Sequence, residues 1–361
     1  MSTQVPKAVL YYSTEDPWSA DVLFDDLLLF SEEKGYGSDE LDLRAVDIAT
    51  VPTLIVPLQK TLSEDVESRY KAITDSVVRR YYPRCNVIRV LRAEPHWQAI
   101  ADFLDKSRSA LSRTHTTSAL PAPVLTPATI AFASTSRIVI IDILHGEDAD
   151  PTALKYLDAT DEASLLTLSK GVLPLLTGQH LTLSQLLSDA EGGDVHVSEK
   201  VKGLWRQRKS EVDKYLEIFS HADKPSSGLD LDLKQKRDEY FARAKLAWEF
   251  KLKESMSMLS KEMIGPYVLG DQLSVADLHL MAWLARMIKL TGGSFSEDGN
   301  TVIAKLEDRV GNGFRLPQDY HLSELQRQEG ASATTQSKLA AFWDAVRERA
   351  SWKKVYGDGL Y

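Results

Sequence analysis

Short apolar and alternating blocks in the first part of the chain predict a compact α/β domain. Residues 18–34 carry apolar positions at helical spacing, and Gly35 is placed to end that helix. Residues 41–46 alternate like a half-buried strand, whereas 8–12 and 51–56 are short β-prone runs. The elements expected in chain order are strand 8–12, helix 18–34, strand 41–46, strand 51–56, strand 70–73 and a helix through residues 77–81. Strands and helices that follow one another in this way are typical of a small α/β domain.

The pattern changes after Pro83, and we expect a first domain over residues 1–84 and an all-helical second domain over residues 85–361. Residues 107–127 are rich in Ser, Thr, Ala and Pro, which indicates an exposed loop or linker. Residues 129–144 fit a β-branched strand and also a buried helix, and we favour the helix.

Helical spacing is clearest in the second half of the chain. Apolar residues recur every three or four positions from Phe241 to Met263, which predicts the buried face of a long helix rather than a cofactor site. A second helical face is formed by Trp205, Val212, Leu216 and Phe219. Residues 291–300 and 311–337 are expected to be loops.

Composition excludes several classes of protein. The 361 residues suggest about two domains at roughly 150 residues each. Apolar residues make up 43% of the chain, so a long disordered protein is excluded. The formal net charge of −9 disfavours attraction to nucleic acids and to anionic membranes. Cys85 is the single cysteine, which excludes an intrachain disulfide.

We expect neither a secretory leader nor a membrane span. The first six residues lack an apolar core, and the most apolar stretches fall short of the ~18 residues that a span needs. The expected location is therefore the cytoplasm. No metal-ligand spacing and no phosphate-binding glycine motif is present, and His279 is expected to be a core or boundary residue.

The strongest local signal is a helix start. Ser274 can cap a helix, and Asp277, three residues later, can reach back to the Ser274 amide, which together form a capping box. Leu273 and Leu278 occupy the two positions of a hydrophobic staple. This motif predicts a helix that begins at residue 275 and continues through an apolar segment.

The sequence around this motif resembles a known family. Residues 267–278 look like the helix-start motif in the C-terminal domain of cytosolic glutathione transferases, and residues 342–352 are similar to the last helices of that domain. The dipeptides Val51-Pro52 and Asp75-Ser76 agree with the thioredoxin-like N-terminal domain of the family. The resemblance implies an α/β thioredoxin-like domain followed by an enlarged all-α domain, which is the glutathione-transferase fold. It covers residues 7–84 and 235–361 well and residues 85–234 poorly.

The resemblance implies glutathione as co-substrate and assigns four residues to its binding. A cis peptide bond before Pro52 would leave the Val51 backbone free to pair with the cysteinyl part of glutathione. Ser76, with the helix amides around it, would bind the γ-glutamyl carboxylate, and Asp75 would lie near the γ-glutamyl ammonium. The alternatives are an ordinary trans proline at a strand start and a plain helix cap at residues 75–76.

The thiol-activating residue departs from the family pattern. Asp16 occupies the position where some members carry Ser or Cys, and a carboxylate there would raise the pKa of a thiol. Asp16 followed by Pro17 is better explained as a helix cap. Tyr12 and Ser13 are therefore the candidates for contact with the sulfur, and a packing role is the alternative for Tyr12.

We expect an enzyme in which the glutathione thiolate attacks an electrophilic, apolar small molecule, as in detoxification. The resemblance also implies a homodimer and no metal. One alternative is a glutathione-dependent isomerase or lyase that acts on a single metabolite. The other is a non-catalytic interaction or regulatory module with the same fold. The insert at 58–68 either covers the site or is inert decoration, and under the isomerase or lyase alternative the long insertions, including 85–234, would shape a narrow pocket.

Overall fold

The protein is described here from a computed structural model. The described residues are 8–12, 28–36, 41–45, 53–57, 87–92, 105, 122, 124–127, 129–193, 197–321, 335–357 and 359. They divide into two compact units. The first consists of Met1–Gly146, Ser255–Arg309 and Gly313–Tyr361, and the second of Glu147–Glu254 and Val310–Asn312.

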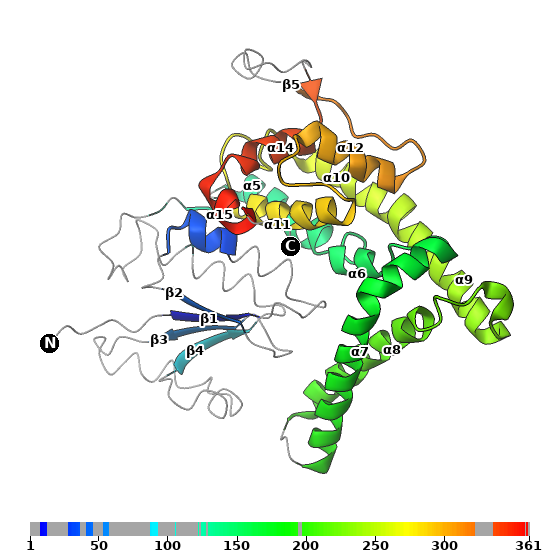
Figure 1. Ribbon diagram of the computed structural model, residues 1–361. Helices are drawn as coiled ribbons and strands as arrows, with labels where there is room; N and C mark the ends of the chain where they lie inside the picture. The colour runs from blue at the N-terminus through cyan, green and yellow to red at the C-terminus, as the bar shows by residue number, and fades with distance from the viewer. Residues whose placement is uncertain are drawn as a thin grey trace. The chain divides into compact units, whose positions relative to one another are not determined.

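A four-stranded sheet belongs to the first unit (Figure 1). Its strands are β1 (Ala8–Tyr12), β2 (Leu41–Ala45), β3 (Thr53–Pro57) and β4 (Val87–Arg92), in the spatial order β2-β1-β3-β4. The β1–β2 pair is parallel, whereas the β1–β3 and β3–β4 pairs are antiparallel.

The sheet tests the strand predictions in part. The strands expected over 8–12, 41–46 and 51–56 are present as β1, β2 and β3. The sequence did not predict β4, which extends the sheet beyond the domain boundary expected at residue 84. The strand expected at 70–73 and the helix expected at 77–81 lie outside the described residues.

A helical segment over residues 28–33 lies between β1 and β2 in the chain, with Leu29 and Phe30 buried. It ends in a Schellman motif, as predicted from Gly35. Gly35 adopts a positive φ of 65°, its amide donates to the Glu32 carbonyl, and the Tyr36 amide donates to the Ser31 carbonyl, at 2.9 Å each. Only a residue without Cβ adopts this backbone conformation without strain.

Helices make up most of the rest of the first unit (Figure 1). They are α5 (Ile130–Arg137), η1 (Ile138–Leu144), α10 (Lys253–Glu262), α11 (Val275–Leu290), α12 (Gly299–Val310), α14 (Lys338–Arg347) and α15 (Ala350–Tyr356). The described residues of the C-terminal region are mostly helical, but the expectation of an all-helical region over 85–361 is wrong in detail, because β4 (Val87–Arg92) and a short hairpin at 320–336 lie within it. In α11 every residue from Ala276 to Ile288 is buried, which makes it the central helix of this core.

The ambiguous segment 129–144 is helical, as favoured from the sequence. It forms α5 and then a π-helical stretch, η1, in which Val139, Ile140 and Ile143 are buried. Both pieces pack on α11, and this tertiary burial outweighs the strand preference of the β-branched residues.

The predicted stripe from Phe241 to Met263 is core, as expected. It lies along one continuous helical rod made of α9 (Leu231–Leu246), the π-helical η3 (Ala247–Leu252) and α10. Phe241 is half-buried, and the other stripe residues are buried: Ala244, Trp248, Leu252, Met256, Leu259 and Met263.

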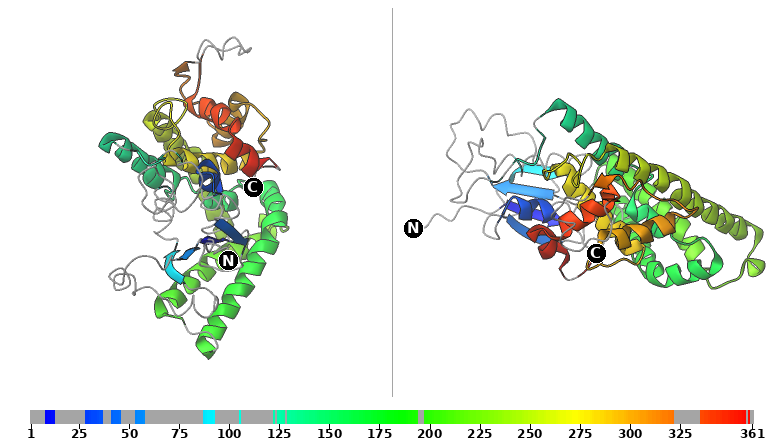
Figure 2. Two further views of the ribbon diagram at one scale, coloured as in Figure 1. Left: turned by 90° about the vertical axis from the view of Figure 1, so that its left-hand side faces the viewer. Right: turned by 90° about the horizontal axis from the view of Figure 1, so that it is seen from above.

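The second unit is helical in its described residues. It contains α6 (Pro151–Tyr156), α7 (Glu162–Gly192), α8 (Glu199–Phe219), the short η2 (Ser226–Gly228), α9 and η3. The helices α7 and α8 run side by side as a long hairpin (Figure 1; Figure 2). Near the C-terminal end of α8, Tyr215 and Phe219 form an aromatic core with Tyr156 of α6 and Tyr240 of α9. Among the helices of the described part, none is long and apolar enough to cross a membrane.

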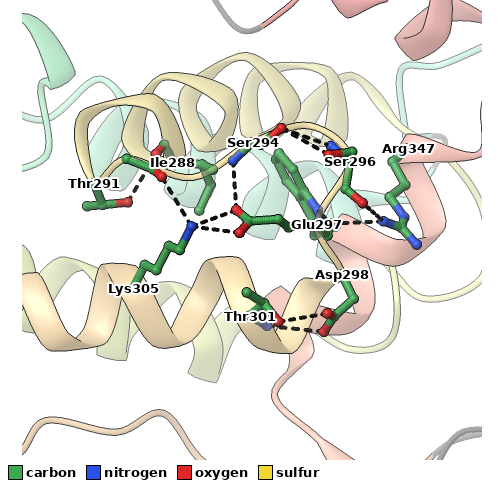
Figure 3. Close-up of polar contacts among 11 residues, drawn as sticks. Ile288, Thr291, Ser294, Ser296, Glu297, Asp298, Thr301, Lys305 and Arg347 are labelled. Atoms are coloured by element: carbon green, nitrogen blue, oxygen red, sulfur yellow. Dashed lines mark hydrogen bonds and ion pairs between the residues drawn. The ribbon is translucent and has the colours of Figure 1, made fainter.

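The loop predicted at 291–300 is present up to residue 298, before α12 begins at Gly299. Its centre is Glu297, whose carboxylate accepts two hydrogen bonds from Lys305 at 2.7 and 2.8 Å and one from the Ser294 amide (Figure 3). Arg347 donates to the Ser296 and Glu297 carbonyls, so the loop is fixed to α14. Within 311–337, the described residues include the short hairpin of β5 (Tyr320–His321) and β6 (Thr335–Gln336).

Candidate functional site

The backbone register of the sheet brings two predicted site segments to the same edge. Tyr11 pairs with Thr53 in the antiparallel β1–β3 pair, and Thr53 directly follows Pro52 in the sequence. Tyr12 is the last residue of β1 and pairs with Ala45, the last residue of β2. The end of β1 and the start of β3 therefore lie next to each other, at the end of the sheet where β1 and β2 finish; we call this end the sheet edge.

The other predicted site residues are not placed by the structure. Ser13, Val51, Pro52, Asp75 and Ser76 lie outside the described residues, and Tyr12 is described at the level of its backbone. Their roles in binding glutathione or its thiol stay predictions.

The predicted capping box at the start of α11 is present and fully buried. Asp277 accepts hydrogen bonds from the Ser274 amide and the Ser274 hydroxyl, both at 2.7 Å. Its other oxygen accepts from the Val268 amide at 2.6 Å. Burial raises the pKa of Asp277 to about 6, and these hydrogen bonds oppose the rise. The residue acts as a structural acceptor that joins the turn at 267–270 to α11.

A second contact holds the first turn of α11. The Val275 amide, which has no partner within the helix, donates to the Leu125 carbonyl at 3.0 Å. The Leu125 amide in turn donates to Asp105 at 3.0 Å. The segment around Leu125 therefore links Asp105 to the helix start.

Asp105 forms a buried ion pair with Lys34, at 3.0 Å between Nζ and Oδ1. Their side chains are 0% and 1% exposed, for Lys34 and Asp105 respectively. The second carboxylate oxygen accepts from the Thr126 amide at 3.1 Å and the Thr126 hydroxyl at 2.8 Å. Burial alone would raise the pKa of Asp105, but the Leu125, Lys34 and Thr126 hydrogen bonds outweigh it and hold that pKa below its usual value.

Glu33, the neighbour of Lys34, forms a second ion pair, in which it is the anion and Arg349 is the cation. The guanidinium donates twice to the carboxylate, at 2.8 and 2.7 Å, and the Ser351 hydroxyl donates at 2.5 Å. Arg349 also contacts the Tyr267 hydroxyl at 3.4 Å. Burial would raise the pKa of Glu33, but the Arg349 and Ser351 hydrogen bonds hold it below its usual value.

A cavity of about 380 Å³ opens beside this second pair. It is lined by Glu32, Glu33, Tyr267, Ala345, Glu348, Arg349, Ala350 and Ser351. Its three carboxylates already have cationic partners, since Glu32 pairs with Lys354 and Glu348 with Lys353, both at close range. These ion pairs therefore hold together the segments that line the cavity, around residues 32–33, 267 and 345–351.

Together these contacts and the short stretches of chain between them form a closed circuit, which we call the α11 ring. It runs through Glu33, Lys34, Asp105, Leu125, Val275, Asp277, Val268, Tyr267 and Arg349. The capping box was visible in the sequence, whereas the two ion pairs were missed. The adjacent opposite charges Glu33-Lys34, directly before the helix-ending Gly35, are a signal for one half of each pair, but nothing near them in the sequence identifies Arg349 or Asp105 as the partners.

The sequence showed no metal-ligand spacing and predicted that His279 lies in the core or at its boundary. Within the ranges that the structure describes, no group of three His, Cys, Asp or Glu residues could hold a metal ion. His279 is buried, as expected, with its Nδ1 3.2 Å from Nε2 of His145. Burial lowers the pKa of His279 to about 3, so this ring is neutral at neutral pH.

Comparison of the chain with protein-family models, with curated proteins and with solved structures finds no match.

Proposed function

We propose that this chain is a glutathione transferase-like enzyme, in which the thiolate of bound glutathione attacks an electrophilic small molecule. The observation that carries the proposal is the register of the sheet, in which Tyr11 pairs with Thr53 at the edge where β1 ends. A site made from the residues after β1 and before β3 needs that meeting of the two segments. The strand order β2-β1-β3-β4, with one parallel and two antiparallel pairs, also suits a thioredoxin-like domain.

Two features of the helical part support the same proposal. The capping box that carries the family resemblance exists, with Asp277 buried and hydrogen-bonded to both Ser274 and Val268. Two later helices, α14 and α15, overlap the second stretch of resemblance at residues 342–352.

In the proposed site the chain binds glutathione as a short extra strand. The Val51 backbone next to Pro52 pairs with the cysteinyl residue, and Ser76 and Asp75 bind the γ-glutamyl end. A hydroxyl from Tyr12 or Ser13 donates to the sulfur, which lowers the pKa of the thiol and raises the thiolate fraction. The thiolate then forms the new C–S bond and the electrophile releases its leaving group.

A thermal-shift series of the full chain with glutathione and S-hexylglutathione tests the binding step. A ligand at one hundred times its dissociation constant stabilises the folded state by about 2.7 kcal/mol, which is easily measured as a rise in Tm. Absence of any shift at millimolar glutathione would refute the proposal.

Two variants test the chemical step in a protein that binds. We expect Tyr12→Phe or Ser13→Ala, whichever removes the sulfur contact, to lower the conjugation rate roughly 10²-fold. Binding without turnover in the native chain, or turnover that neither variant changes, would contradict the assignment of the thiol donor.

A further inference from the structure

The outer side of α7 is exposed and almost free of charge. Between Ala163 and Ser188 the helix has a single charged residue, Lys170, whereas α8, which runs beside it (Figure 1), carries charged residues along its whole length. The buried side of α7 includes Leu165, Val172, Leu176 and Leu183. A surface helix normally has charged side chains on the side away from its core, so the uncharged outer side of α7 indicates a further partner.

The exposed residues on this outer side repeat with the spacing of a helix–helix contact. They follow one another in alternating steps of four and three residues, and each is exposed: Thr167, Gly171, Pro174, Gly178, Leu181, Gln185 and Ser188. Such steps keep residues on one side of a helix, as in the contact row of a coiled coil. We call this row the α7 seam. Leu181, near its middle, is 62% exposed.

Two glycines of the α7 seam leave room for a neighbouring helix. A Cβ added at Gly171 or at Gly178 would meet no atom within 4 Å, so packing inside the chain does not require glycine at either position. Two packed helices approach more closely where the side chains at their contact are small. Since Leu181 lies three residues from Gly178, the seam carries a knob and a hole side by side. A surface with both is complementary to its own copy.

We infer that the α7 seam is an interaction surface for a second copy of this chain, with the two α7 helices antiparallel. The two-fold axis then lies midway between residues 179 and 180, so that Leu181 of each copy lies opposite Gly178 of the other. The seam matches itself along its length in this register, with Gly171 opposite Ser188 and Pro174 opposite Gln185. Each contact occurs twice, as in other two-fold symmetric dimers.

The charges near the two ends of the seam select the antiparallel order. Lys170 and Glu191 lie on the same flank of the seam, separated by three heptads, and both are exposed. Glu191 also pairs with Arg206 of its own chain, but its side chain is 62% exposed and stays accessible. In an antiparallel pair the same flanks face each other, so Lys170 of each copy lies opposite Glu191 of the other. In a parallel pair Lys170 would face Leu175, and this ion pair would be lost.

The length of the seam sets the expected affinity. From Thr167 to Ser188 an α-helix rises roughly 30 Å, so the contact is narrow and lies at the lower end of the size range of specific interfaces. We therefore expect a dimer Kd on the order of 10 µM. The inference does not depend on the proposed function, since α7 lies in the segment that the family resemblance covers poorly.

Sedimentation velocity of the full chain, at concentrations from roughly 1 to 200 µM, measures the dimer directly. Leu181→Glu places a charge opposite each glycine and should weaken the dimer at least roughly tenfold. Leu204→Glu is the matched control, because Leu204 is an exposed leucine of α8 outside the seam, and it should leave the dimer unchanged. Circular dichroism and the Tm of each variant establish that it is folded.

Two charge reversals test the order of the helices. Lys170→Glu and Glu191→Lys each bring like charges together at both ends of the seam, so each alone should weaken the dimer roughly tenfold. An equimolar mixture of the two variants restores opposite charges at both ends. The mixture should therefore associate as tightly as the native chain.

Three results would overturn the inference. The first is a native chain that stays monomeric at roughly 200 µM, even if α7 binds a partner of another kind. The second is a dimer that Leu181→Glu leaves unchanged, because such a dimer forms through another surface. The third is a mixture of the two charge-reversed variants that associates no better than either variant alone, which excludes the antiparallel order.

Discussion

At the scale of single residues, Asp277 is the acceptor on which the start of α11 depends. Asp277→Ala leaves the buried amides of Val268 and Ser274 without a partner. Each such loss costs about 1–3 kcal/mol, so we expect the free energy of unfolding to fall by about 2–6 kcal/mol in total. Urea unfolding followed by circular dichroism measures this. Asp277→Asn keeps one acceptor oxygen and should fall between the alanine variant and the native chain.

Gly299 marks a close approach between α12 and α14. A Cβ added there would lie 2.1 Å from the Ala340 carbonyl oxygen, which is backbone and cannot move aside. We expect Gly299→Ala to lower the free energy of unfolding by about 1–3 kcal/mol. Gly203→Ala is the matched control, because Gly203 lies in exposed α8 with open space around it. That variant should stabilise the protein by about 0.5–1 kcal/mol, and equal effects of the two would be inconsistent with this account.

The carboxylates of the two ion pairs predict acid sensitivity. The pKa values of Glu33 and Asp105 are below their usual values in the folded state, so the unfolded state binds protons more readily. Their contribution to the free energy of unfolding is therefore complete above the pKa of about 4 that these carboxyls have in the unfolded state. It is lost as the pH falls toward the lower pKa of the folded state. Each group gives the free energy of unfolding a slope of up to about 1.4 kcal/mol per pH unit.

Asp105→Asn separates this effect from general acid unfolding. At pH 7 it removes the negative charge that faces the buried Lys34 ammonium at 3.0 Å, and breaking a buried ion pair in this way costs about 3–5 kcal/mol. Below pH 5 its stability should fall less steeply than that of the native chain. Urea titrations between pH 3 and 7 measure the free energy of unfolding of both proteins. If it depends on pH equally in the two, the pKa of Asp105 does not differ between the folded and unfolded states.

At the scale of elements, the rod made of α9, η3 and α10 allows the same residue type to be compared at a buried and at an exposed position. Met256 is fully buried, whereas Met258, two residues later on the same helix, is 45% exposed. We expect Met256→Ala to cost about 2–5 kcal/mol and Met258→Ala to cost under about 0.5 kcal/mol. Chemical unfolding of both variants measures the difference. Similar losses of unfolding free energy in the two variants would contradict the burial of the Met256 face of this helix.

Elements with a local signal could be predicted from the sequence, and the others could not. Gly35, the Ser274–Asp277 box and the stripe through Trp248 all depend on neighbours within one or two helical turns. The 31-residue α7 gave no such signal, because it includes Gly171, Pro174 and Gly178 and is apolar around much of its circumference. Such residues lower the helix preference, and only packing against α8 restores it.

At the scale of the whole molecule, the parts of the site that depend on distant contacts were missed. Lys34 and Asp105 are 71 residues apart, and Glu33 and Arg349 are 316 residues apart. Nothing local in the sequence selects these partners from the many other charged residues. The strand β4 was missed for the same reason, because its position is set by pairing with β3 and its own sequence, with Arg at every third position, lacks the alternation typical of a strand.

The surplus length of the chain is also explained at this scale. The segment that the family resemblance covers poorly contains α5, η1, α6, α7 and α8, of which the α7–α8 hairpin is the largest part. The same segment begins with β4, which joins the four-stranded sheet, and its other described residues are mainly helical, so the enlargement adds helices rather than a further sheet. The hairpin belongs to the second compact unit, whereas the sheet and the α11 ring belong to the first.

The most direct test of the central claim is a crystal structure of the full chain soaked with S-hexylglutathione. We predict ligand density at the sheet edge where β1 ends and β3 begins, with the peptide of the ligand paired to the Val51 backbone. The sulfur should lie within about 3.5 Å of the Tyr12 or Ser13 hydroxyl. Ligand bound elsewhere, or no ligand at millimolar concentration, would contradict the account.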